Sequence, residues 1–142
     1  MSYIKIMVHC VWGTKNRSPI LLAVKRNQLI VHIKENARMK NIFIDSIGGY
    51  HDHLHCLVSL GADQSIAKVM QLIKGESSFW ANSEKIMPQK LEWTEDYFAA
   101  SVNEASLITV RNYIKNQEEH HLNISFKQEY ENFIRNYGFH LG

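Results

Sequence analysis

The chain has 142 residues and a mass of 16.5 kDa, the usual size of a single domain. Its 45% hydrophobic and 21% charged residues argue against a disordered chain. No apolar run approaches the roughly 20 residues of a membrane helix, and the first residues lack the features of a signal peptide. Cys10 and Cys56 are too few for a disulfide scaffold. We therefore expect one domain over residues 1–142, in the cytoplasm and with no membrane partner.

Positive charge is concentrated in the first two thirds of the chain. Residues 1–90 hold 12 Lys and Arg against 6 Asp and Glu, a balance of +6, whereas residues 91–142 hold 4 against 8, a balance of −4. Such asymmetry can mark a surface that meets a polyanion. The alternative is an ordinary solvated face that happens to be basic.

The first part of the chain predicts a strand, a basic loop and a helix. Tyr3–Trp12 is rich in β-branched and aromatic residues, which is typical of a buried strand. Residues 13–19 form a basic loop with turn-forming residues. Pro19 suits the first position of a helix with Ser18 as its cap, and apolar residues then recur at helical spacing.

A hairpin is predicted next. Asn41–Ile47 alternates apolar and polar residues, Gly48-Gly49 indicates a turn, and Leu54–Leu60 predicts the next antiparallel strand. Residues 64–82 have helical spacing, 83–96 look irregular, and Tyr97–Val102 predicts a fourth strand.

Two further helices are predicted in the last part of the chain. The first is capped by Ser101 or Asn103 and runs to about His121. The second is indicated by aromatic residues at helical spacing, namely Phe126, Tyr130, Phe133 and Tyr137. The first six elements give the order βαββαβ, which predicts an α+β fold: a ferredoxin-like antiparallel sheet with additional C-terminal helices.

His53-Leu54-His55 is the sharpest chemical motif. Alternate residues of a strand face the same side, so both imidazoles project together while Leu54 faces the core. Two histidines about 7 Å apart along a strand can share one metal ion. This spacing also arises by chance, so two exposed histidines on a sheet are the alternative.

Tyr113 and Gln117 are four residues apart and therefore lie on one helical face. A tyrosine hydroxyl beside a metal-bound phosphodiester can act as a nucleophile because the ion polarises the phosphate. Gln117 offers a neutral oxygen that suits Mg²⁺ or Mn²⁺ better than zinc. The alternatives are a half-buried aromatic for Tyr113 and a solvated polar residue for Gln117.

Together these motifs resemble a family. HLH on a strand and YIKNQ on a later helix look like the HUH single-stranded DNA nucleases, and among them the single-tyrosine transposases of IS200-like insertion sequences, including their repeat-associated relatives. The resemblance covers most of the chain. Its motifs are VHCVWGTKNRSPIL, HDHLHCLVSL, IAKVMQLIKGESS and the run from Trp93 through YFAASV to YIKNQEEHH.

The resemblance implies an enzyme with named site residues. His53 and His55 would be metal ligands, Gln117 the third protein ligand and Tyr113 the nucleophile, with Mg²⁺ or Mn²⁺ as the cofactor. Tyr113 would attack single-stranded DNA with hairpin ends and leave a 5′-phosphotyrosine link and a free 3′-hydroxyl, so that strands are cut and rejoined in two steps. This chemistry would excise and insert a small mobile element. The resemblance also implies a homodimer in which the helix of Tyr113 can complete the partner's histidine site.

Basic side chains near these motifs are candidate phosphate contacts. They are Lys15 and Arg17 in the first loop, Lys68 and Lys74 on the second helix, and Arg111 and Lys115 beside Tyr113. Each can equally be a solvated surface residue. His120 and His121 are expected to do no chemistry, and the aromatic run from Phe126 to Tyr137 is expected to serve packing or a dimer surface.

Three other functions compete with this interpretation. A non-catalytic nucleic-acid-binding module on the same fold would carry stacking aromatics on its central strands, and Leu54–Leu60 has none. A structural zinc protein needs four closed ligands, and the chain has no Cys pair to complete them. A metal-dependent hydrolase usually shows more carboxylates near its histidines than Asp52 alone. If Tyr113 is not the nucleophile, Tyr97, Tyr130 and Tyr137 are the next candidates.

Overall fold

The computed structural model describes residues 1–137 and has an α+β fold with one four-stranded antiparallel sheet in the order β2-β3-β1-β4. The strands are β1 Met7–Gly13, β2 Phe43–Gly49, β3 His53–Ser59 and β4 Phe98–Val102. The helices are α1 Ala23–Met39, α2 Ile66–Ser83, α3 Leu107–Lys115, α4 Gln117–His120 and α5 Phe126–Tyr137. This confirms the predicted ferredoxin-like order with additional C-terminal helices. No helix in the described part of the chain is long and apolar enough to span a membrane.

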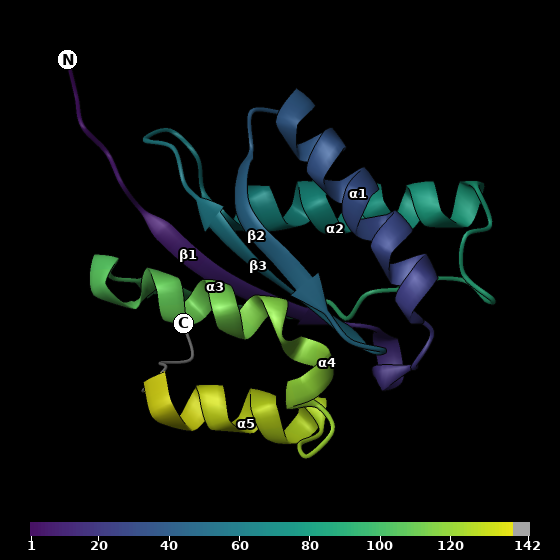
Figure 1. The fold of residues 1–142 in the computed structure, drawn as a ribbon. Coiled ribbons are helices and arrows are strands. Elements are labelled where there is room, and N and C mark those ends of the chain that lie inside the picture. Colours follow the sequence, from purple (N-terminus) through teal and green to yellow (C-terminus); the bar gives the residue numbers. More distant parts are fainter. Residues whose placement is uncertain (138–142) are drawn as a thin grey trace.

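The two faces of the sheet carry different layers of helices. Helices α1 and α2 cover one face, and α3, α4 and α5 lie on the other (Figure 1). Alternation along β1 and β3 sends Cys10, Trp12, Leu54 and Cys56 into the main hydrophobic core beneath α1 and α2. The same alternation turns the two histidines of β3 toward α3 and α5, so the second face is where chemistry can occur. Cys56 is a small buried residue, and burial raises the pKa of its thiol.

Two predicted boundaries near the N-terminus are wrong. The first strand begins at Met7 rather than Tyr3, because residues 1–6 are exposed and, within the described part of the chain, only the Ile6 carbonyl oxygen among them is bonded to the neighbouring backbone segment, at Leu60 N. Helix α1 begins at Ala23, and Ser18 has an extended backbone and does not cap it. The loop before it contains a short 3₁₀ turn at Lys15–Arg17 and then two buried residues, so the chain packs into the core before it turns helical.

The turn predicted at Gly48-Gly49 is also wrong, because β2 continues through both glycines and the chain reverses at residues 50–52. A Cβ atom at Gly48 would lie 2.4 Å from the carbonyl oxygen of Ile114, and one at Gly49 would lie 2.3 Å from that of His53. Glycine at position 48 therefore lets α3 approach the sheet closely. This contact brings the helix that carries Tyr113 against the strand pair that carries the histidines.

The helix predicted to run to His121 is divided at Asn116 into α3 and α4. Of the two predicted caps, Asn103 is the one used: its side chain accepts a hydrogen bond from Ser106 N at the start of a 3₁₀ turn, Glu104–Ser106, that leads into α3. The division matters for the site because it lets Tyr113 and Gln117 reach the sheet from separate segments.

Candidate active site

His53 and His55 lie on the inner, central strand β3 and face α3 and α5. Both side chains are fully buried, so the alternative of two exposed histidines is wrong. His53 pairs with Gly13 of β1, and His55 pairs with Val11. The predicted common orientation of the two imidazoles is confirmed, with Leu54 in the core on the opposite face.

Each imidazole is held through its Nδ1 atom. His53 Nδ1 lies 2.8 Å from Asp52 Oδ1, and His55 Nδ1 lies 2.9 Å from Nε2 of the buried His9 on β1. These contacts fix the ring orientations and direct both Nε2 atoms toward the space below α4 and α5. Outer partners of this kind orient the histidines of metal sites.

Gln117 reaches the same space from the first position of α4. Its Oε1 atom is 3.1 Å from His53 Nε2 and 3.0 Å from His121 Nε2. Its Nε2 atom donates a hydrogen bond of 3.1 Å to the carbonyl oxygen of Tyr113, so the amide oxygen is the atom that faces the histidines. Gln117 is buried rather than solvated.

Glu129 on α5 lies at the centre of the cluster. Its Oε1 atom is 3.0 Å from His55 Nε2 and 3.2 Å from His53 Nε2. Its Oε2 atom is 2.9 Å from His120 Nε2 and accepts a hydrogen bond from the hydroxyl of Tyr113. A single buried carboxylate thus contacts both histidines of β3 and the predicted nucleophile.

Aromatic contacts hold α5 over the sheet. The Phe126 ring stacks on His53 with a centroid separation of 4.1 Å and an interplanar angle of 2°. Gly13 leaves room for this ring, because a Cβ atom there would lie 2.5 Å from Phe126 Cε2. The ring centroid of Phe133 lies 5.6 Å from that of His9 and 4.8 Å from that of Phe98. These residues of the predicted aromatic run therefore pack against the site.

Burial and charge act against each other in this cluster. Burial lowers the pKa of His9 to about 3 and that of His55 to about 4, so both imidazoles are neutral at pH 7. Burial also opposes the charged form of His53, but hydrogen bonds to Asp52 and Glu129 outweigh it and raise its pKa. Although burial alone would raise the pKa of Glu129, its histidine partners hold that pKa well below its usual range. Glu129 is therefore an ionised carboxylate inside the protein.

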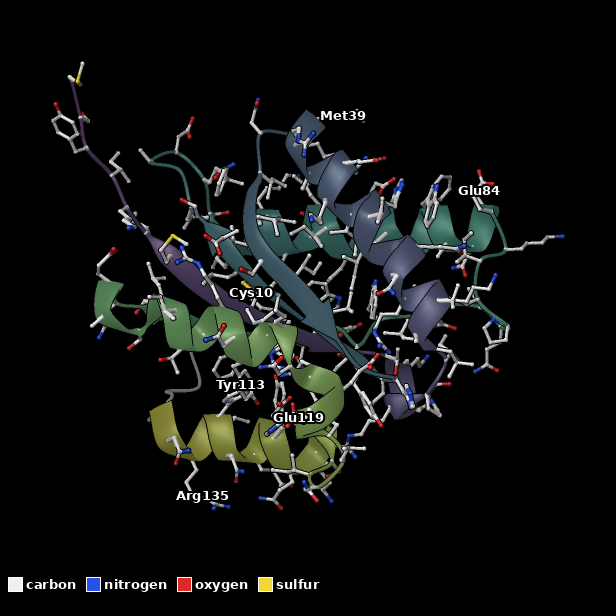
Figure 2. All side chains as sticks on the ribbon, viewed as in Figure 1. Cys10, Met39, Glu84, Tyr113, Glu119 and Arg135 are labelled. Carbon is white, nitrogen blue, oxygen red and sulfur yellow. The ribbon has the colours of Figure 1, made fainter. Side chains whose placement is uncertain are left out.

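Tyr113 connects this cluster with solvent. The half-buried side chain lies between α3 and α5 (Figure 2), and its hydroxyl is also 3.2 Å from His120 Nε2. Tyr113 and His120 line an open groove of about 690 Å³ that is formed by α3, α4 and the residues that follow α4. The groove also presents the amide side chains of Asn112, Asn116 and Asn123. A ligand in the groove would therefore meet Tyr113 at the edge of the buried centre.

The donor set fits a divalent metal. One ligand atom from each of His53, His55, His121 and Glu129 lies within 4.8 Å of the others, and Gln117 Oε1 lies beside them. Imidazole nitrogens and carboxylate or amide oxygens are ordinary metal ligands. The structure thus brings three predicted ligands together with two residues that were not predicted.

The predicted phosphate contacts lie in different environments. Lys68 and Lys115 are exposed, Arg17 lines a small pocket beside Gly13, and Lys15 Nζ is 3.6 Å from a carboxylate oxygen of Glu92. Lys74 is committed to the protein, since its ammonium donates to the carbonyl oxygens of residues 94–96 at 2.6–3.5 Å. Arg111 forms a two-pronged ion pair with Asp45 at 2.8 and 2.9 Å.

Sequence reasoning missed four residues of the cluster. His9, His120, His121 and Glu129 all contact it, although His120 and His121 were expected to do no chemistry. Glu129 had a detectable signal: it interrupts the apolar stripe of α5 three residues after Phe126 and four before Phe133. An acidic residue on the buried face of an amphipathic helix needs a partner.

Comparison with known proteins gives the class. The family model described as "Transposase IS200 like" matches residues 2–117. The chain belongs to the IS200-like transposase family, because this match covers most of its length. Transposases are DNA-processing enzymes, and the resemblance stated from the motifs is confirmed.

Two solved structures share the fold. A crystal structure of a protein described as a candidate transposase from Deinococcus radiodurans R1 has 22% identity and a TM-score of 0.64, covering 82% of this chain and 93% of that one. A REP-associated tyrosine transposase bound to a REP hairpin has 18% identity and a TM-score of 0.64, covering 85% and 72%. At these identities the likeness shows the fold alone. Comparison with curated proteins gives no significant match.

Proposed function

We propose that this transposase cuts and rejoins single-stranded DNA with Tyr113 as its nucleophile and a divalent metal, Mg²⁺ or Mn²⁺, held by His53, His55 and Gln117. The observation that carries the proposal is the Tyr113 hydroxyl, which contacts the same carboxylate as both histidines of β3. The nucleophile and the ligands therefore converge within one chain. The reaction would excise and insert a small mobile element.

The chain's residues have distinct roles in the proposed step. The Tyr113 oxygen bonds to phosphorus, the bond from phosphorus to the 3′ oxygen breaks, and a 5′-phosphotyrosine and a free 3′-hydroxyl result. The tyrosine proton leaves for Glu129 Oε2 or His120 Nε2, which both lie at the hydroxyl, and the 3′ oxygen gains a proton in turn. A divalent ion in the site supplies polarisation of the phosphate.

Support for DNA as the partner comes from the family and from the surface. The REP-associated relative is bound to a hairpin, and we extend this to propose single-stranded DNA with hairpin ends as the substrate here. The groove beside Tyr113 has neutral amide groups that can hydrogen-bond a strand. Of the predicted phosphate contacts, Arg17, Lys68 and Lys115 are exposed and accessible to DNA. Lys15 is also exposed but lies 3.6 Å from Glu92, and Lys74 and Arg111 would have to leave protein partners.

We further propose a homodimer. The resemblance implies that α3 of one chain can complete the partner's site, and here Tyr113 already reaches the cluster of its own chain. The measurement is the molar mass in solution at micromolar concentration. A monomer under these conditions would contradict the proposal.

The test of the function is a covalent adduct between protein and DNA on a denaturing gel. Labelled single-stranded DNA from the ends of the mobile element is incubated with Mg²⁺ or Mn²⁺ and with wild type or Tyr113→Phe. We expect a metal-dependent adduct that the variant lacks. An adduct that survives in the variant would move the nucleophile to Tyr97, Tyr130 or Tyr137.

Two further outcomes favour the competing functions. Cleavage by both wild type and Tyr113→Phe without any adduct would indicate a hydrolase that uses water. The buried Glu129 supports that alternative, because it adds a second carboxylate near the histidines besides Asp52. Binding of several DNAs without cleavage would favour the non-catalytic binding module.

A further inference from the structure

We infer that Glu129 is a bridging residue of the active centre: Oε1 is a ligand of the divalent metal, and Oε2 holds the Tyr113 hydroxyl beside the ion. This inference rests on the proposed function, and it adds to the centre a ligand that comes from helix α5. Glu129 would then be the part of the site that fixes the distance between the metal and the nucleophile.

The spacing of the donor atoms is that of adjacent ligands around one ion. Ligands about 2.1 Å from an octahedral ion lie about 3.0 Å from their neighbours. Glu129 Oε1 lies 3.0 Å from His55 Nε2 and 3.2 Å from His53 Nε2. Gln117 Oε1 lies 3.1 Å from His53 Nε2 and 3.0 Å from His121 Nε2. These four separations match those of adjacent ligands around one ion.

The hydrogen-bonding chemistry also points to a cation at this position. His53 Nδ1 faces the Asp52 carboxylate, which only accepts, so a neutral His53 carries its proton on Nδ1 and presents a lone pair at Nε2. That lone pair faces Gln117 Oε1 and Glu129 Oε1, which are acceptors as well. The orientation of the amide is fixed because its NH₂ donates to the Tyr113 carbonyl. With His53 neutral, three lone pairs converge here, and a bound cation would satisfy them together.

Glu129 has the burial and the second contact that the bridging role needs. The residue is 2% exposed, and an ionised carboxylate without a positive partner is costly at that depth. Its Oε2 atom accepts the hydroxyl hydrogen of Tyr113 and is 2.9 Å from His120 Nε2. One rigid carboxylate therefore spans from the ligand cluster to the nucleophile.

The competing role for Glu129 is that of a plug, which fills the metal position through hydrogen bonds to a protonated His53 and must leave before an ion binds. The two roles predict opposite effects on metal affinity. Removing the carboxylate charge weakens binding if Glu129 is a ligand and strengthens it if Glu129 competes with the ion.

The experiment is calorimetric titration of the metal-free, full-length protein with MnCl₂. Glu129→Gln removes the charge at nearly constant size, and Glu131→Gln makes the same change at an exposed position of the same helix. We expect the Kd for Mn²⁺ to rise at least about 10-fold in Glu129→Gln and to stay unchanged in Glu131→Gln. Glu129→Asp keeps the charge but shortens its reach, and it should fall between wild type and Glu129→Gln.

Unchanged or tighter Mn²⁺ binding by Glu129→Gln would overturn the inference. If that variant does not fold, as judged by its circular dichroism, the comparison of Glu129→Asp with wild type decides. In that case an affinity equal to that of wild type overturns it.

A second measurement tests the bridge to Tyr113. At saturating Mn²⁺ the metal site of Glu129→Gln is filled, so a residue that acted only as a ligand would show full adduct formation. We expect the rate of adduct formation to stay at least about 10-fold below wild type; full recovery would show that Glu129 does not position Tyr113. Tyr113→Phe should bind Mn²⁺ as wild type does. Failure of the proposed function would appear in the adduct assay of Tyr113, whereas failure of the ligand role appears in the titration, which needs no DNA.

Discussion

The hydroxyl of Tyr113 donates a hydrogen bond to Glu129, sixteen positions further along the chain. Tyr113 belongs to α3, which lies against the sheet through Gly48, and Glu129 belongs to α5, which lies over the histidines of β3. The contact therefore joins two separately packed helices at the point where the proposed nucleophile meets the proposed metal site. Predictions about the packing of α3 and α5 are thus predictions about the site.

Gly48→Ala should destabilise the protein because its Cβ would lie 2.4 Å from the Ile114 carbonyl oxygen, which is backbone and cannot move aside easily. We expect a loss of about 2 kcal/mol in the free energy of unfolding, measured by urea denaturation. Gly75→Ala in α2 is the matched control, since nothing lies within 4 Å of its Cβ. It should raise stability by about 0.5–1 kcal/mol. Equal effects of the two changes would contradict the close approach of α3.

Phe126→Ala should loosen α5 because it removes the ring that stacks on His53. Phe126 is 8% exposed, and we expect a loss of about 3 kcal/mol together with faster amide exchange in α5. Phe79→Ala is the control, because Phe79 is 73% exposed and should change stability by less than about 0.5 kcal/mol. Slow exchange in α5 of the Phe126 variant would show that another contact holds this helix.

Arg111→Gln should lower the urea midpoint slightly at neutral pH, because the hydrogen-bonded Arg111 holds the pKa of Asp45 below its usual value of 3.8. A depressed carboxyl pKa contributes stability above the unfolded pKa, and that contribution is lost as pH falls through the folded pKa. The difference between wild type and variant should therefore shrink below pH 3.8. Asp45→Asn should reproduce the effect, and the double variant should add nothing. An additive double variant would show that the pair is not coupled.

Substitutions of Lys68 and Lys74 should have different effects, the first on DNA binding and the second on the stability of the fold. Lys68 is exposed on α2, so Lys68→Ala should weaken binding of single-stranded DNA and reduce the salt dependence of log K by about 1, with stability unchanged. Lys74→Ala should instead lower the urea midpoint, because its ammonium holds the carbonyls of residues 94–96. Fluorescence anisotropy at several salt concentrations checks the first effect. A salt slope left intact by Lys68→Ala would remove this residue from the DNA surface.

The order of strands and helices could be predicted from periodicity because alternation in β3 and helical spacing in α2 are local properties. The residues at which strands and helices begin and end could not be predicted in this way, because they depend on tertiary contacts. The strand β2 continues through Gly48, which pairs with His55 and is packed closely by α3, and α1 starts at Ala23 because the preceding residues enter the core. Neither contact can be seen in a short window of sequence.

The candidate site divides in the same way. His53 and His55 could be found because their spacing on a strand is a local pattern, and Tyr113 and Gln117 because of their helical spacing and the family resemblance. Glu129 and His9 enter the cluster from α5 and β1, and their partners lie 74 and 46 positions away in the chain. Only the folded chain brings such residues together.

The wide separation of the cluster's residues has a consequence for the lifetime of the protein. An ion shared by His55 and Glu129 would close a loop of 74 positions. In the chain-entropy model, a permanent cross-link of that span disfavours the unfolded chain by about 4 kcal/mol. Metal supply would then set how long the C-terminal helix resists proteases. A molecule without the ion would be cleaved first near α5. Loss of metal would therefore lead to proteolysis of the enzyme as well as to loss of its activity.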